Sequence, residues 1–353
     1  MLSNLYPAHA VGGYERMCRD VVQRFRHRGH EVAVLTTRFR ADGSASEAEE
    51  QGVHRNLGFY WDGREIVCPP LWRQGLIERG NRRCLGRLLD AFAPNVVSVW
   101  GMGGLSLGLL ALLARRRVPL VYVVGDDWLV YGSWADCWMR RFADRDTVAG
   151  LLALATRLAT RPPDIGATGA FCFASEFIRR RAEEVGGWAF PIATVTYAGI
   201  DRGDFPPATD PQSERSWRWR LLCVGRLTEQ KGLETAVRAL ASLPAEATLE
   251  IVAGGDREYG RQLEALAASL GVAERLRLLP PVERAACVIA TSPPTRSSSR
   301  ALGRRHSGWW PSKPWPAGRR WSRLASAGRR SSSSTGPIAS ASHPAMQGDS
   351  RRR

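Results

Sequence analysis

Two glycine-containing loops of this chain have the residue types that hold phosphates. The first reads V-G-G-Y-E, and its glycines, Gly12 and Gly13, directly precede a segment with helical periodicity. Glycines let backbone N–H groups approach an anion closely, and a helix N-terminus adds a favourable partial charge. We therefore predict an anion site at these two glycines. The alternative is an ordinary turn, because a glycine pair before a helix is common there.

The second loop reads V-G-R-L-T-E-Q-K-G over residues 224–232. Its Arg226 and Lys231 can converge on one diphosphate, because arginine supplies a fork of donors and lysine a point charge. Lys231 is one of only two lysines beside 48 arginines, which argues against a random surface placement. The alternative is a solvated basic loop.

Alternating strands and helices position these loops. Strands are expected at residues 2–5, 31–36, 95–100, 120–124, 170–174, 194–197, 220–224, 248–253 and 276–279, and helices at 14–28, 233–243 and 260–270. This alternation predicts an α/β fold with parallel, helix-covered sheets. The first strand lies directly at Met1, so we expect either a very short strand or a start codon placed too late.

Composition divides the chain into an α/β domain over 1–205, a polar linker over 206–219, a shorter α/β segment over 220–283 and a tail over 284–353. The tail carries 14 Lys and Arg against one acid, so most of the net charge of +16 belongs to it. It contains five Ile, Leu, Val or Phe against 15 Ser. Such a segment cannot bury enough apolar surface to offset its chain entropy, and we expect it to be disordered.

Cysteine usage and hydropathy favour a cytoplasmic setting. The seven cysteines form no C-x-x-C pair and no zinc-ligand spacing, and their odd number favours a reducing compartment. The longest uncharged apolar run, residues 102–114, is too short to span a bilayer. The inner membrane surface is a further partner that the sequence allows, through a peripheral contact.

Several motifs resemble the retaining family-4 glycosyltransferases over residues 1 to about 283. They are G-G-Y-E, V-T-Y-A-G-I-D-R-G-D-F before the linker, V-G-R-L-T-E-Q-K-G after it, I-V-A-G-G-D and R-L-R-L-L-P-P-V-E-R. The resemblance implies the GT-B fold of two facing Rossmann-like domains, the second of which is incomplete here. It also implies a nucleotide-sugar donor bound mainly by the second domain, an acceptor on the first, and no metal or other cofactor.

The resemblance also implies roles for individual residues. Backbone N–H groups of Gly12 and Gly13 would bind the donor diphosphate, and two cations would neutralise it as it leaves. The residues carried over to the donor side are Gly12, Gly13, Arg226, Lys231, Gly254 and Gly255.

On the acceptor side, the family often places a sugar-contacting histidine after the strand at 120–124. This chain has Gly125 there, followed by Asp126 and Asp127. The two aspartates are candidates for acceptor contacts. The alternative is that they cap the segment that follows them.

The family's next signature, E-x7-E, has no counterpart, because no acid lies between Glu283 and Asp349. In the family its first Glu contacts the sugar and its second the ribose. Residues 303–315 read G-R-R-H-S-G-W-W-P-S-K-P-W. The same sequence results when codons for the family-like stretch W-E-E-A-F-G-L-V-A-L-E-A-M-A are read one nucleotide later. Each tryptophan of that stretch has the single codon TGG, which constrains the hidden frame strongly. We therefore predict a frameshift between Val282 and Leu302.

The sequence thus predicts a glycosyltransferase gene product that is inactive as written, with unassigned catalytic residues, donor sugar and acceptor. An alternative is a protein that binds nucleic acid or an anionic membrane through the Arg and Trp of its tail. Out-of-frame decoding accounts for the same residues, so no specific nucleic-acid partner is expected. A third hypothesis is a sugar-binding or regulatory remnant that uses the first domain alone.

Overall fold

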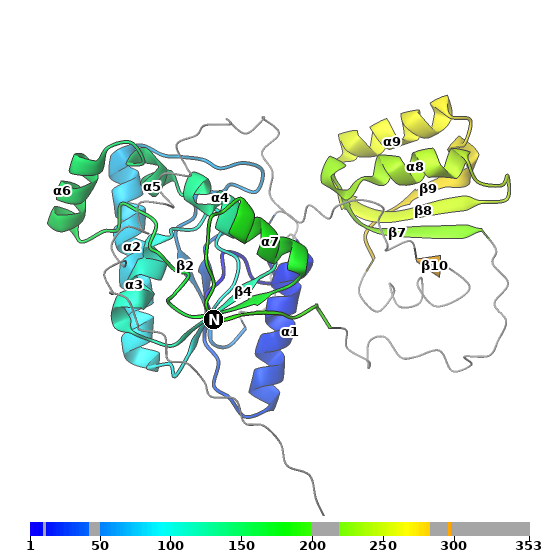
Figure 1. Cartoon of the computed structure of the whole chain (residues 1–353). Helices are drawn as coiled ribbons and strands as arrows, with labels where there is room; N and C mark the ends of the chain where they lie inside the picture. Colours follow the sequence, from blue (N-terminus) through cyan, green and yellow to red (C-terminus); the bar gives the residue numbers. More distant parts are fainter. Residues whose placement is uncertain (10–11, 42–49, 200–218, 283–295, 298–353) are drawn as a thin grey trace, which may run out of the picture.

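The computed structural model describes residues 1–9, 12–41, 50–199, 219–282 and 296–297. They form two α/β units, one on each side of the linker (Figure 1). Strands pair in parallel in both units, which confirms the α/β class predicted from the alternation of strands and helices.

The sheet of the first unit is built around the very start of the chain. Its strands are β1 (Val34–Thr37), β2 (Val53–Leu57), β3 (Val97–Val99), β4 (Leu120–Val124), β5 (Ala170–Phe173) and β6 (Ala193–Val195). They pair as β1-β2 and as β3-β4-β5-β6. Leu2 joins the two groups through parallel bridges to Leu35 of β1 and Val99 of β3. The strand expected at 2–5 therefore has a central place but is reduced to one bridging residue.

Helices alternate with these strands along the chain. They are α1 (Gly13–His27), α2 (Leu71–Phe92), α3 (Gly108–Arg116), α4 (Trp128–Ala135), α5 (Cys137–Arg141), α6 (Asp146–Thr156) and α7 (Glu176–Glu184). The helix predicted at 14–28 is α1. Helix α2 was not predicted, because its buried face begins with the polar residues Gln74, Glu78 and Asn81. Apolar periodicity is absent where those side chains point inward.

A buried carboxyl group lies where α2 meets two loops of the first unit. Glu78 is 4% exposed and accepts a hydrogen bond of 2.8 Å from the hydroxyl of Tyr60. The hydroxyl of Ser106 donates to its other oxygen. Burial, and then the nearby carboxylate of Asp136, raises the pKa of Glu78 to about 8. Glu78 is therefore held in its protonated form at neutral pH.

The second unit is smaller. It contains β7 (Arg220–Leu227), a 3-10 turn (Glu229–Lys231), α8 (Leu233–Ala241), β8 (Thr248–Gly255), α9 (Arg257–Ser269), a second 3-10 turn (Ala273–Arg275) and β9 (Leu276–Leu279). The two helices lie on one face of the sheet (Figure 1). Their inward side chains Val237, Leu240 and Leu263 are fully buried against Leu249 and Ile251 of β8. This core accounts for the folding of the part of the chain predicted as an incomplete second domain.

A two-residue strand, β10 (Arg296–Ser297), pairs in parallel with β7. It lies inside the segment predicted to be disordered, so that prediction is wrong for these two residues. An edge strand such as β7 presents unpaired N–H and C=O groups, which explains why a short extended piece can pair there. The rest of the predicted tail, including 303–315, lies outside the described residues.

A disulfide joins Cys68, in the loop before α2, to Cys137 at the start of α5. The Cα atoms lie 5.4 Å apart, and the two residues are separated by 69 positions in sequence. Cysteine spacing does not predict a pair so distant, and a disulfide is not expected in the reducing setting that the odd count favours. Tertiary folding brings the two side chains together, because α5 packs on α2.

Reduction of this disulfide is expected to lower the free energy of unfolding by about 4 kcal/mol, because the closed loop is long and its opening frees the unfolded chain. Urea denaturation followed by circular dichroism, with and without a phosphine reductant, measures the change. A Cys68→Ser variant should unfold like the reduced protein and ignore the reductant, whereas Cys84→Ser should respond as the natural chain does. If reductant left the free energy of unfolding unchanged, the assignment of the disulfide would be wrong.

Candidate functional site

The first candidate loop leads directly into α1. Gly12 is the N-cap in an extended conformation, with a φ of −155°, and Gly13 is the first helical residue. A Cβ atom on Gly13 would meet nothing within 4 Å. Packing therefore does not require glycine at position 13, where the missing side chain leaves the backbone at the start of the helix accessible.

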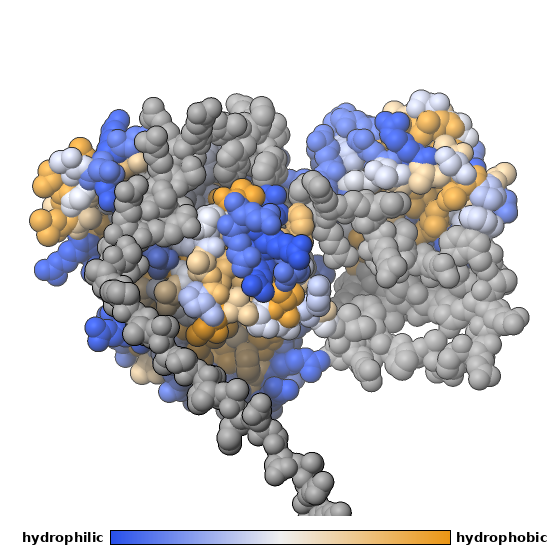
Figure 2. Space-filling view, in the orientation of Figure 1, coloured by the Kyte–Doolittle hydropathy of each residue, from blue (hydrophilic) through white to orange (hydrophobic). Residues whose placement is uncertain are grey.

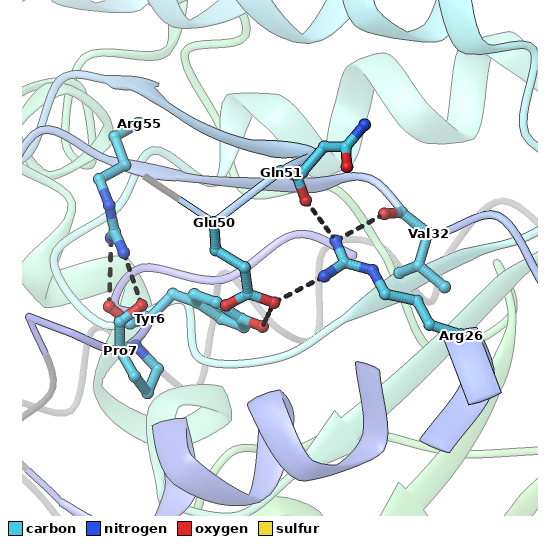
Figure 3. Close-up of polar contacts among 7 residues, drawn as sticks. All are labelled: Tyr6, Pro7, Arg26, Val32, Glu50, Gln51 and Arg55. Atoms are coloured by element: carbon cyan, nitrogen blue, oxygen red, sulfur yellow. Dashed lines mark hydrogen bonds and ion pairs between the residues drawn. The ribbon is translucent and has the colours of Figure 1, made fainter. Parts of the chain in front are cut away.

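An arginine network holds the chain that precedes this loop (Figure 3). Arg55 of β2 donates to the carbonyl oxygens of Tyr6 and Pro7, at 3.1 and 2.6 Å. Arg26, in the last turn of α1, donates to Glu50 at 2.6 Å, and Glu50 also accepts a long bond from the Tyr6 hydroxyl. These bonds tie the chain before the loop, and the last turn of α1, to the edge of the sheet.

Tyr14, the third residue of G-G-Y-E, fills the space beside Gly125. A Cβ atom on Gly125 would lie 2.5 Å from two ring carbons of Tyr14. The ring packs against Trp100 with centroids 5.6 Å apart, and its hydroxyl donates to the carbonyl oxygen of Val123. The position where the family often has a sugar-contacting histidine is thus occupied by an aromatic ring from α1. Glycine is required at 125 by this packing.

Gly125→Ala is expected to lower the free energy of unfolding by about 1–3 kcal/mol, because its methyl group overlaps a ring that is fixed at both ends. Gly150→Ala is the matched control. It lies within α6 with no atom near its Cβ, and alanine there should be neutral or slightly stabilising. Thermal denaturation of both variants measures the difference. Equal melting temperatures for the two variants would contradict the steric role of Tyr14.

Glu15, the last residue of the motif, is a buried acid beside the same loop. It is 9% exposed, and its Oε2 atom has no hydrogen-bond partner among the described residues. Burial raises the pKa of Glu15, while backbone N–H groups of the loop and then the charge of Arg226 lower it. Sequence reasoning used only the glycines of this motif and missed both Tyr14 and Glu15. The G-G-Y-E motif itself was the available signal.

The two aspartates after β4, Asp126 and Asp127, are hydrogen-bonded within the first unit. Asp126 accepts hydrogen bonds from the Tyr131 hydroxyl at 2.8 Å and from the N–H of Trp128 at 3.3 Å. Burial raises the pKa of Asp126 to about 7. Asp127 is 5% exposed and accepts from Nε of Arg181 at 3.0 Å, which links α4 to α7. Asp126 therefore bonds the first turn of α4, whereas the N-cap residue Asp127 makes no side-chain capping bond and pairs with Arg181 instead.

The second candidate loop begins later than the sequence predicts. β7 continues through Leu227, so Arg226 lies on the strand and pairs in register with Gly254 of β8. The prediction that this strand ends at residue 224 is wrong, because Gly225 has an extended backbone and continues the hydrogen-bonded pairing with β8. Arg226 is half-buried at the carboxyl end of the strand, where parallel sheets bind ligands.

Lys231 closes the 3-10 turn that follows, and Gly232, the N-cap of α8, has a φ of 64°. Only glycine adopts such a conformation without strain, so the K-G pair fixes the turn into the helix. Between the two cations, Oγ1 of Thr228 is buried without a hydrogen-bond partner in the described part of the chain. Thr228 is a further polar group that sequence reasoning missed, because a single threonine in a loop carries no signal.

The glycine pair after β8 has a packing explanation. A Cβ atom on Gly254 would lie 2.8 Å from Cγ of Pro281. Gly255 has a φ of 131°, and a Cβ atom there would lie 3.0 Å from the carbonyl oxygen of Leu227. Both glycines allow β8 to end close against its neighbours, at the same edge of the sheet as Arg226.

Two parallel α/β units, each with a glycine-containing turn that leads into a helix, are the arrangement of the GT-B class of folds. The sequence model described as Glycosyltransferase Family 4 matches residues 11–202, more than half of the chain. The chain therefore belongs to Glycosyltransferase Family 4. A comparison with curated protein sequences finds no match.

Solved structures show the same fold at low identity. A glycosyltransferase from Rickettsia africae ESF-5 is 12% identical, with a TM-score of 0.51 over 82% of this chain and 70% of that one. The lipopolysaccharide outer core galactosyltransferase WaaB, in its apo form, is 15% identical, with a TM-score of 0.51 over the same shares. Anabaena HepE, in complex with UDP, is 18% identical, with a TM-score of 0.48 over 80% of this chain and 69% of that one. At these identities, the likeness to the first two structures shows the fold alone.

Proposed function

We propose that this chain derives from a retaining, metal-independent enzyme that transfers a sugar from a nucleotide-sugar to an acceptor hydroxyl. The observation that carries the proposal is the edge formed by Arg226 and Gly254, followed by the turn to Lys231. Two cations and an unpartnered hydroxyl at the end of a strand fit a diphosphate. The acceptor class is a lipid-linked, cell-surface or metabolite hydroxyl. The proposed compartment is the cytoplasm, where the Cys68–Cys137 pair would be kept reduced.

Each group has a role in this proposal. Arg226 and Lys231 neutralise the charge that develops on the leaving diphosphate, which lowers the barrier to transfer. Backbone N–H groups at Gly12 and Gly13 bind the same diphosphate from the first unit. Asp126 and Asp127 lie at the carboxyl end of β4, on the acceptor side, where they position the segment that would contact the acceptor.

The 353-residue chain itself is proposed to have little or no transferase activity. Its translated frame contains no acid between Glu283 and Asp349, so it lacks both glutamates of the E-x7-E signature. Diphosphate binding does not need those glutamates, which makes nucleotide binding the appropriate test of the proposed site.

Calorimetric titration of the full chain with UDP, GDP and ADP tests the site. Binding of at least one is expected, and Arg226→Ala should weaken it roughly tenfold to a hundredfold, because a hydrogen-bonded charge pair is lost. The matched control is Arg238→Ala, which removes an exposed arginine further along α8. Absence of nucleotide binding, or equal weakening by both variants, would overturn the assignment.

A further inference from the structure

Contacts that do not involve sulfur fix the position of Cys137, the first residue of α5. The carboxylate of Asp136 caps this helix and accepts hydrogen bonds of 3.0 Å from the N–H groups of Trp138 and Met139. The indole N–H of Trp138 donates to the carbonyl oxygen of Ala159 at 2.8 Å. The fold therefore holds Cys137 in place whether or not its disulfide has formed.

Cys68 is held by the loop that leads into α2. Directly before it, the N–H of Val67 donates to the carbonyl oxygen of Tyr60 at 2.7 Å. Directly after it, the carbonyl oxygen of Pro69 accepts a hydrogen bond of 2.6 Å from the fully buried side chain of Gln74. The Cα atoms of the two cysteines, 5.4 Å apart, therefore lie within disulfide range because of the fold itself.

The two cysteines differ in exposure and in their neighbours. Cys137 is 2% exposed, whereas Cys68 is half-buried, so a small solute in water reaches Cys68 first. Nη2 of Arg140, three residues after Cys137, donates to Sγ of Cys68 at 3.0 Å. The guanidinium group also lies over the ring of Trp134, with Cζ 5.3 Å from the ring centroid. A cation held beside a sulfur atom stabilises the thiolate, which is the form that attacks oxidants.

Cys84 of α2 provides a contrast within the same unit. It is also half-buried, but its Sγ donates to the carbonyl oxygen of Asn56 at 3.8 Å. A carbonyl acceptor favours the protonated thiol and does not stabilise the thiolate. Exposure alone therefore does not distinguish Cys68 from Cys84, whereas the contact with Arg140 does.

The surface around α5 is mixed. Figure 2 shows hydrophilic side chains next to apolar ones at the end of the first unit where α5 and α6 lie. No helix in the described ranges is long and apolar enough to cross a bilayer. The charged residues from the end of α5 to the start of α6, Arg141, Asp144 and Arg145, are exposed. Solvent and salt screen such charges, whereas Arg140 is half-buried, so Arg140 is the cation that acts on the sulfur.

We propose that Cys68 is an oxidation site for hydrogen peroxide and that Cys137 is its resolving thiol. The thiolate of Cys68 attacks one peroxide oxygen, so an S–O bond forms and the O–O bond breaks. The departing hydroxide takes up the proton that Cys68 lost and leaves as water, and Cys68 becomes a sulfenic acid.

The second step forms the disulfide. Sγ of Cys137 attacks the sulfenic sulfur of Cys68, the S–S bond forms, the S–O bond breaks, and the hydroxyl group leaves with the proton of Cys137 as a second water. Two thiols and one peroxide thus give one disulfide and two waters, without a further co-reactant. The structure shows the oxidised state, and a low-molecular-weight thiol that attacks the more accessible Cys68 returns the pair to its reduced state.

Treatment of the fully reduced full chain with one equivalent of peroxide tests the assignment. The reaction is stopped with N-ethylmaleimide and mapped by mass spectrometry. The Cys68–Cys137 disulfide is expected to form while Cys84 stays a thiol. In Cys137→Ser, dimedone should trap a sulfenic acid at Cys68, and in Cys68→Ser the buried Cys137 should stay reduced. Equal oxidation of Cys68 and Cys84 in the natural chain would overturn the proposal, and this comparison needs no substitution.

Arg140→Met tests the role of the guanidinium group, because methionine keeps much of the side-chain length without the charge. The rate constant for oxidation of Cys68 is expected to fall about tenfold, as for a thiol whose thiolate fraction falls by that factor. The matched control, Arg141→Met, removes an exposed arginine of the same helix and should leave the rate unchanged. Equal rates for the two variants would overturn the activation of Cys68 by Arg140.

Discussion

We expect about a thousandfold more sugar-transferase activity from a chain whose reading frame has been restored than from the 353-residue chain. The restored gene differs by one nucleotide between the codons for Val282 and Leu302. The restored frame would supply the E-x7-E signature, whose two carboxylates act on the sugar and the ribose by family resemblance. Release of nucleotide from a panel of nucleotide-sugars, with and without candidate acceptors, measures the gain. Resequencing across residues 280–305 would locate the shift directly.

The control is the restored chain with both glutamates of the signature changed to glutamine. It should keep the fold and nucleotide binding but lose the gained activity. Nucleotide release by the 353-residue chain at the rate of the restored one would contradict the proposal. That result would show that the described residues suffice for catalysis.

The second large effect concerns pH and the buried Glu78. Its pKa is raised in the folded state, from an ordinary 4.5 to about 8, so the folded protein binds a proton that the unfolded chain has released. The stability that Glu78 contributes is therefore complete below about pH 4.5 and is lost as pH rises towards 8. Between these limits, its contribution falls by up to about 1.4 kcal/mol for each pH unit.

Glu78→Gln removes this proton-linked term while preserving the shape of the side chain and its contacts with the hydroxyls of Tyr60 and Ser106. The variant is expected to be less stable than the natural chain at pH 5 and to gain relative stability steadily towards pH 8. Urea denaturation at several pH values gives the difference curve. The control, Glu184→Gln, alters an exposed acid of α7 and should give a flat difference curve. A flat curve for Glu78→Gln as well would show that Glu78 ionises freely.

Much of the fold was predictable because its signals are local. The buried strand β4 appears in the sequence as an apolar run of the observed length, β9 has the bounds predicted for it, and α1 follows from apolar spacing after Gly13. The two phosphate-loop candidates were also visible, because glycines and cations carry their own conformational and electrostatic preferences. Predictions were wrong where neighbouring segments decide, as at the end of β7, which the pairing with β8 carries on to Leu227.

The sequence by itself determined the α/β class and the positions of Arg226 and Lys231, and the prediction of an out-of-frame signature behind residues 303–315 rests on it alone. Only the tertiary structure decided how Tyr14 replaces a side chain at Gly125, how Cys68 reaches Cys137, and why α2 buries Glu78. These features depend on contacts between residues far apart in sequence. Each is decided by which side chains share a volume, and a local pattern carries no information about that until the chain has folded.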